Sequence, residues 1–314
     1  MTTFSPRLRK RYPVRKVHSG GFSLVELLIA ITLGLLILVG VGSVFLGSKQ
    51  SFRSQESLSQ VQEAGRFSAL LVIPHIRLAG YVSDPLQRSD PTTIFTDTYR
   101  AVWGIDDGDT SATLPTGISK LATSDLLEVR YTGQSVFGLP APAPADESIS
   151  PCGRRSISDT EMGVNIFYVD IDSSGKPNLY CHSEIRQANA PVNFAPGGVG
   201  TTQPFIAGVT DFQVLYGVDT NEADDSPAPP AQPGLFPNRY VTAANVTDWR
   251  RVVAVKLDIT SAGIDATEAG PEEARGASVT ATADGGAAIR NVNEDRQLQR
   301  VFSSTVLIRN RLRE

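Results

Sequence analysis

The 314-residue sequence has little cysteine, histidine or tryptophan: it contains two cysteines, three histidines and two tryptophans. Two cysteines are too few for a disulfide-dense scaffold or a cysteine-rich zinc site. The sequence also lacks the common motifs of nucleophile elbows, Walker A loops, dinucleotide-binding loops and zinc metalloproteases. We therefore expect a protein that is not an enzyme and that holds no cofactor.

Acidic residues are absent from residues 1–21, which carry six Lys and Arg. The rest of the chain holds 23 Lys and Arg against 33 Asp and Glu, so its net charge is near −10. A general nucleic-acid binder carries an excess of Lys and Arg over Asp and Glu, so we expect no nucleic-acid partner. Hydrophobic content of 41% is close to the globular average, which predicts that most of the chain folds.

Charge is absent from Leu27 to Gly47, a run of 21 residues. A helix of about 20 apolar residues spans the hydrocarbon core of a bilayer. The basic run before it predicts a cytoplasmic N-terminus, which places everything from Lys49 onward across the membrane. A secretory signal would instead have a short apolar core followed by a small-residue cleavage site. We therefore expect the apolar segment to be retained as a membrane anchor.

The start of the apolar run reads GGFSLVE at residues 20–26 and contains a glutamate. A charged group well inside a bilayer costs on the order of 3 kcal/mol and marks a functional site by default. Gly21, Phe22 and Glu26 resemble the motif of type IV prepilins, in which a glycine precedes a phenylalanine and the fifth mature residue is a glutamate. The alternative is an ordinary signal-anchor helix with an accidental glutamate.

The resemblance implies that prepilin peptidase cleaves between Gly21 and Phe22, and that the new amine of Phe22 is methylated. It also implies that Glu26 pairs with the N-terminal amine of a neighbouring subunit. Such pairing is physically reasonable because an apolar bundle strengthens an ion pair and penalises an unpaired charge.

Beyond Gly47 the chain turns polar but keeps a helical rhythm. One helix face collects small and apolar residues: Leu58, Val61, Ala64, Gly65, Ser68, Leu71, Val72 and Ile76. We expect a long helix from Phe22 to Ile73, which Pro74 should kink or end. Gly80 should terminate whatever follows, so the helical segment should finish by Gly80.

The remaining sequence is typical of β-strands separated by loops. Six strands are predicted: Leu126–Thr132, Val164–Ile171, Leu179–Ile185, Val209–Val218, Val252–Thr260 and Val301–Arg309. The turn sequence DSSGKPN between Asp170 and Leu179 predicts a hairpin. Low-complexity stretches beginning at Leu139 and Glu222, and roughly Ala262–Gln299, are expected to be loops that either contact partners or are solvated insertions without a role.

These patterns predict an α+β fold, in which a long N-terminal transmembrane and amphipathic helix packs on a mostly antiparallel β head. With the resemblance to prepilins, the chain divides into four parts. They are a cleaved leader at 1–21, a transmembrane helical segment at 22–47, an amphipathic continuation at 48–80, and a periplasmic β-rich head with loop insertions at 81–314.

Four further segments resemble PilW-type minor pilins: Ser48–Phe67, Ile76–Tyr81, Trp249–Thr260 and Arg300–Arg311. Pro74 departs from that pattern. The resemblance implies a structural subunit that sits in the inner membrane with its head in the periplasm and then enters a type IV pilus at the cell surface. It implies a role in priming pilus assembly near the tip. The implied partners are other minor pilins, the major pilin, prepilin peptidase, the pilus platform protein and ATPase, and a large tip adhesin.

Cys152 and Cys181 lie 29 positions apart in a segment that the predicted topology places in the oxidising periplasm. We expect a disulfide between them, which would stabilise the head by roughly 3 to 4 kcal/mol. The alternative is two separately buried thiols.

No metal site is expected. The first half of an EF-hand loop is matched by Asp170, Asp172, Ser174 and Gly175. The calcium interpretation fails because Cys181 stands where the bidentate glutamate should be. A second and equally speculative calcium candidate consists of Asp219, Asn221, Asp224 and Asp225. After leader removal His75 and His182 are the remaining histidines, and they form no catalytic pattern with other residues.

Two alternative functions remain open. A J-type pseudopilin of a type II secretion system has the same leader, helix and large β head, although the late strand sequences favour the pilus. A tip adhesin whose acidic loops bind a surface ligand or calcium is the second alternative.

Overall fold

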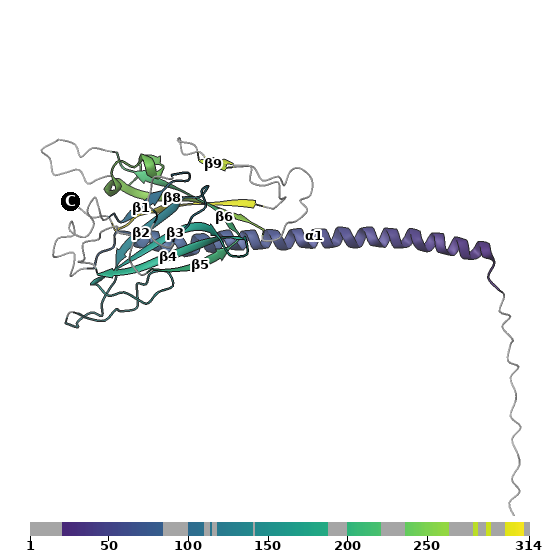
Figure 1. The fold of residues 1–314 in the computed structure, drawn as a ribbon, viewed down its shortest axis with the longest axis horizontal. Coiled ribbons are helices and arrows are strands. Elements are labelled where there is room, and N and C mark those ends of the chain that lie inside the picture. The colour runs from purple at the N-terminus through teal and green to yellow at the C-terminus, as the bar shows by residue number, and fades with distance from the viewer. Residues whose placement is uncertain are drawn as a thin grey trace, which may run out of the picture. The chain divides into compact units, whose positions relative to one another are not determined.

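The computed structural model describes residues 21–83, 100–109, 114, 118–140, 142–187, 200–220, 236–263, 279–281, 287–289 and 299–310. The predicted fold class is confirmed: one long N-terminal helix is followed by antiparallel β-sheets (Figure 1). The chain divides into two compact units, one ending at Ser51 and the other beginning at Phe52. The second unit therefore contains the C-terminal part of the helix together with the sheets.

Helix α1 runs from Leu24 to Leu78 and includes Pro74. The helix therefore does not end at Pro74, but it finishes before Gly80, as expected. Proline removes one backbone donor, but here four helical residues follow it and the helix is buried on both sides of it, at Val72 and Ile76. Gly80 has a positive φ of 73°, and its N–H donates to the carbonyl of Arg130 at 2.9 Å, so the chain that leaves the helix is bonded directly to a strand of the head.

The part of α1 from Phe52 onward buries a stripe of mostly small residues: Ser57, Val61, Gly65, Ser68, Val72 and Ile76. The predicted face is thus largely confirmed, but Leu58 is 41% exposed and its neighbour Ser57 is buried instead. At Gly65 the helix comes so close to the head that an added Cβ would lie 2.0 Å from ring carbons of Phe302. Small residues in the stripe therefore set the distance between helix and sheet.

The first sheet has five antiparallel strands in sequential order: β1 (Val102–Ile105), β2 (Leu126–Thr132), β3 (Glu161–Ile171), β4 (Pro177–Gln187) and β5 (Thr201–Ala207). The hairpin predicted between Asp170 and Leu179 joins β3 to β4, with Ile171 opposite Pro177. Each strand pairs with the next along the chain, so the sheet is an antiparallel meander.

The second sheet has four strands in the order β11-β8-β6-β7. Their bounds are β6 (Val209–Val218), β7 (Arg239–Val241), β8 (Val252–Ala262) and β11 (Gln299–Leu307). Two short 3-10 helices, η2 (Ala243–Asn245) and η3 (Trp249–Arg251), connect β7 to β8. In Figure 1 the strands of both sheets gather around the C-terminal part of α1.

One hydrophobic core joins the three layers of the second unit. It contains Val72 and Ile76 from α1, Leu127 and Phe167 from the first sheet, and Phe212 from the second sheet. Because every layer contributes, the head-side part of the helix is an integral part of the domain's core.

All six predicted strands exist, although β3, β4 and β8 extend beyond the predicted limits and β11 ends at Leu307. Strands β1, β5 and β7 were not expected. The interpretation of Ala262–Gln299 as entirely loop is also wrong, because β9 (Val279–Ala281) pairs with β10 (Ala287–Ile289) inside it. Four of these strands have only three or four residues, so the local sequence offers too few alternating positions for detection. Strand β5 has seven residues but contains Pro204, which argues against a strand.

Candidate assembly segment and disulfide site

The first turn of α1 contains the residues that the prepilin motif singles out. Phe22 precedes the helix and is 83% exposed. Ser23 accepts hydrogen bonds at the helix start, from the N–H of Glu26 to its hydroxyl (3.2 Å) and from the N–H of Leu27 to its carbonyl (3.1 Å). Ser23 is therefore the N-cap, and Glu26 is the third residue of the helix.

The Ser23–Glu26 pair is a feature that the motif-based interpretation missed. A serine at the N-cap with a glutamate three positions later is the capping-box pattern, which the sequence displays directly. An acidic side chain in the first turn also interacts favourably with the helix dipole. Glu26 thus has a local role in starting the helix, which is compatible with a role between subunits.

Between Phe22 and Gln50 every residue is exposed except the glycines at 34 and 42, which are intermediate. Within the described residues, α1 is the one helix long and apolar enough to cross a membrane. A helix that is apolar all round is stable when lipid or other helices surround it. This segment therefore needs lipid or the helices of other subunits around it, which is consistent with a membrane-anchored pilin.

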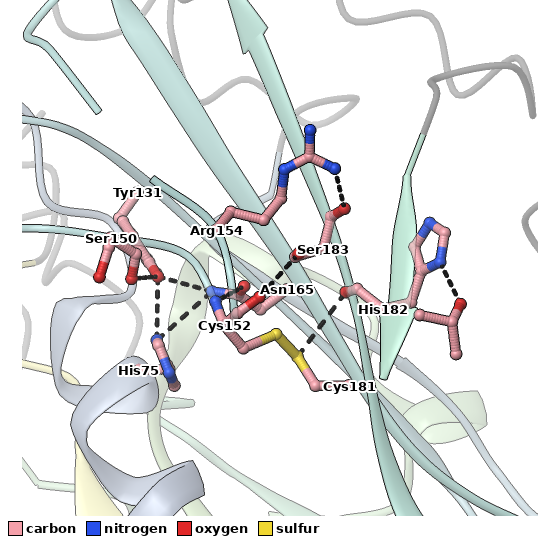
Figure 2. The surroundings of a disulfide bond; sticks show 10 residues. His75, Tyr131, Ser150, Cys152, Arg154, Asn165, Cys181, His182 and Ser183 are labelled. Atoms are coloured by element: carbon pink, nitrogen blue, oxygen red, sulfur yellow. Dashed lines mark hydrogen bonds between the residues drawn. A yellow bond between two sulfur atoms is a disulfide. The ribbon is translucent and has the colours of Figure 1, made fainter. Parts of the chain in front are cut away.

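The disulfide joins Cys152, in the segment before β3, to Cys181 on β4, with Cα atoms 6.5 Å apart (Figure 2). Both cysteines are almost completely buried. The Cys152 backbone is held on both sides, because its N–H donates to Asn165 Oδ1 (2.9 Å) and its carbonyl accepts from the Ser183 hydroxyl (2.9 Å). The covalent bond therefore fastens a loop to the middle of the first sheet.

Asn165, on β3, extends this arrangement toward the helix (Figure 2). Its Nδ2 donates to the Tyr131 hydroxyl at 2.6 Å, while its Oδ1 holds Cys152. The Tyr131 hydroxyl lies 2.9 Å from His75 Nδ1 and donates to the carbonyl of Ser150 at 3.1 Å. A continuous polar network thus links the disulfide loop, two strands and the last turns of α1.

His75 enters this network from the helix and packs between aromatic rings. Its ring centroid lies 6.1 Å from that of Tyr131 and 5.6 Å from that of Phe167. Burial lowers the pKa of His75 to about 4, because charged imidazolium would lose its hydration there. His75 is therefore neutral at physiological pH and serves as a hydrogen-bonding group inside the head.

The acidic side chains of the turn that resembles half of an EF-hand accept hydrogen bonds from the protein itself. Asp172 accepts hydrogen bonds from the Ser174 hydroxyl (2.6 Å), the Ser174 N–H (2.8 Å) and the Lys176 N–H (2.9 Å), and these lower its pKa to about 2. Asp170 accepts a hydrogen bond from Ser119. Among the described residues, no three His, Cys, Asp or Glu side chains gather as metal ligands would. In the second calcium candidate, Asn221, Asp224 and Asp225 lie outside the described residues.

The comparisons with known proteins concern the head most directly. Residues 166–310 match the family model described as "Type IV Pilus-assembly protein W". No curated protein matches the chain. Among solved structures, a type IV-like pilin from Thermus thermophilus is similar, with 12% sequence identity and a TM-score of 0.42 over 83% of this chain and 98% of that one. The family match covers β3 from its middle through the rest of the described head, and pilus-assembly pilins are structural, non-enzymatic proteins. Over residues 166–310 the resemblance to the PilW family of type IV pilus-assembly proteins is thus confirmed.

Proposed function

We propose that the chain is a minor pilin, a structural subunit that helps to prime a type IV pilus and is placed near the pilus tip. The observation that carries the proposal is the exposed apolar part of α1, which begins with a capped glutamate and belongs to a chain whose head matches a pilus-assembly family. An apolar rod leaves the bilayer when neighbouring rods replace its lipid contacts, so such subunits bundle.

In this proposal prepilin peptidase cleaves after Gly21, the amine of Phe22 is methylated, and Glu26 pairs with the amine of an adjacent subunit. Before assembly the N-terminus is cytoplasmic and the head is periplasmic. Other minor pilins, the major pilin, the platform protein and a large tip adhesin are the proposed partners. The capping geometry supports the pairing because it fixes Glu26 in the first turn, near where a neighbour's amine would arrive.

The test separates the local role of Glu26 from its role between subunits. Glutamine also functions at the third position of a capping box, so Glu26→Gln should preserve the helix start while removing the charge. The unpaired amine of the neighbour would cost up to about 3 to 5 kcal/mol in a bundle. We expect the variant to be processed and membrane-resident, but absent from sheared pili and unable to restore piliation in a deletion strain.

Glu56→Gln provides a matched control, because Glu56 is exposed on the same helix but lies in its polar part. It should enter pili like the wild type. Mass spectrometry of the wild type should find methylated Phe22 as the first residue, and Gly21→Arg should block that processing. If Glu26→Gln restored normal pilus number, the proposed pairing would be wrong. A deletion strain that loses protein secretion but keeps its pili would instead identify a J-type pseudopilin.

A further inference from the structure

Three large apolar side chains of the head are exposed together on the connection between β2 and β3. Phe137 is 99% exposed, and Val136 and Leu139 are exposed beside it. Residues 136–140 read VFGLP and contain no charged or hydrogen-bonding side chain, and we call them the VFGLP loop. Single exposed apolar residues are normal on a protein surface, whereas an exposed apolar cluster marks an interaction site.

Backbone hydrogen bonds fix the start of the VFGLP loop. The N–H of Val136 donates to the carbonyl of Pro144 (2.9 Å), and the N–H of Asp146 donates to the carbonyl of Gln134 (3.0 Å). An antiparallel bridge lies between these two bonds, so together they form a short two-stranded ladder. The loop is therefore positioned before a partner arrives, which reduces the entropy cost of binding.

Side chains attach this ladder to the rest of the head. The Ser135 hydroxyl donates to the Asp159 carboxylate at 2.7 Å. The Tyr81 hydroxyl donates to Gln134 Oε1 at 2.6 Å, and Tyr81 follows the C-terminal end of α1. From Phe52, where the chain enters the head, to that end the helix is about 40 Å long at 1.5 Å per residue. The ladder is thus anchored at the end of the head that lies opposite Phe52.

The charges beside the VFGLP loop narrow the class of partner. Asp146 and Glu147 are both exposed on the returning side of the ladder. The Ser148 hydroxyl and N–H donate to Asp146 and lower the pKa of its carboxyl, which is therefore ionised at neutral pH. Two negative charges disfavour an anionic lipid surface. They favour a protein in which Lys or Arg borders an apolar pocket, because complementary charges align the two surfaces.

We propose that the VFGLP loop inserts Phe137 into an apolar pocket of another protein of the same pilus, and that Lys or Arg at the rim of that pocket meets Asp146 and Glu147. An aromatic side chain that fills a pocket is a typical anchor of a protein interface. The inference rests on the proposed function, since the partner is a component of the pilus. It also interprets the low-complexity stretch that begins at Leu139 as a partner contact rather than a solvated insertion.

Photo-cross-linking identifies what covers the loop. Replacing Phe137 by p-benzoylphenylalanine in the full-length chain keeps an aromatic ring there, and the protein is cross-linked in cells of a deletion strain. We expect one cross-linked partner, which mass spectrometry also finds in sheared pili. The same probe at Ile171, which is 49% exposed at the end of β3, should not capture that partner. Cross-linking to a second copy of this chain, to lipid or to a protein absent from pili would overturn the proposal, as would no cross-link at all.

Phe137→Ser tests whether the contact is needed for assembly. Because Phe137 is almost fully exposed, thermal stability, processing and membrane insertion should stay as in the wild type. The amount in sheared pili should fall at least tenfold, as expected when an aromatic anchor is lost. Ile171→Ser is the matched control and should enter pili normally. If Phe137→Ser enters pili as well as the wild type does, this inference fails and the proposed function stands. If the wild type itself is absent from pili, the proposed function fails.

Discussion

Helix α1 has a different surface on the two sides of Ser51. From Leu24 to Gln50 its residues are exposed and almost all apolar, whereas from Phe52 to Leu78 it is polar outside a buried stripe of mostly small residues. A continuous helix thus combines a segment that is exposed in the described part of the chain and a segment that belongs to a folded core. The stability of the first segment therefore depends on lipid or other subunits, whereas the second segment is stabilised by the sheets of the head.

Removing the disulfide should have the largest effect on the head and none on the apolar segment. The double variant Cys152→Ser/Cys181→Ser removes the bond that closes a loop between cysteines 29 positions apart. It should lower the free energy of unfolding by about 3 to 4 kcal/mol. Denaturant titration of the oxidised wild type and the variant measures this loss. Membrane insertion should remain unchanged, because the apolar segment lies in the other compact unit. Equal stability of the two proteins would show that the disulfide is dispensable.

The same substitution should have opposite effects in the two segments of α1. An added Cβ at Gly65 meets the Phe302 ring, so Gly65→Ala should destabilise the head by about 1 to 3 kcal/mol. At Gly47 nothing lies within 4 Å, so Gly47→Ala should stabilise the helix by up to about 1 kcal/mol. Denaturant titration measures the first effect, and the helical signal in circular dichroism the second. A destabilised Gly47→Ala, or a neutral Gly65→Ala, would contradict the proposed division.

The sequence predicted the features that depend on local pattern. The apolar run, the stripe through Val61 and Val72, and strands β2 and β6 follow from periodicity, and the bounds of these two strands agree with the prediction. The capping role of Ser23 was also readable from its spacing to Glu26. By contrast, the continuation of the helix through Pro74 could not be decided from the sequence, because it depends on the packing of Val72 and Ile76 on both sides of the proline, which is a tertiary effect.

The remaining features depend on contacts between distant residues. Asn165 stands alone among apolar residues of β3, and nothing local shows that it would bond both Cys152 and Tyr131. Trp103 and Trp249 line the same cavity, which the sequence could not show because β1 is a four-residue strand that carries no usable periodicity. The sequence therefore predicts which segments form helices and strands, but not which side chains the sheets bring together.

The smallest predicted effect concerns His75, the histidine through which the buried part of α1 joins the disulfide network. Its pKa is about 4 in the folded protein and near 6.5 when unfolded, so the unfolded chain binds a proton that the native head does not. Stability is therefore fully present above pH 6.5 and should fall as the pH falls from 6.5 toward 4. At pH 5.5 the loss should be at most about 1.4 kcal/mol relative to pH 7.5. Denaturant titrations at the two pH values measure it.

His75→Gln isolates the contribution of His75 to the pH dependence of stability, because glutamine can still hydrogen-bond to Tyr131 but does not titrate. Carboxylates that titrate in the same range affect both proteins alike, so they cancel when the two pH differences are subtracted. The variant should lose less stability between pH 7.5 and 5.5 than the wild type does. If both lost the same amount, His75 would be equally able to bind a proton in the folded head. The end of α1 would then be more open to water than its contacts with Tyr131 and Phe167 indicate.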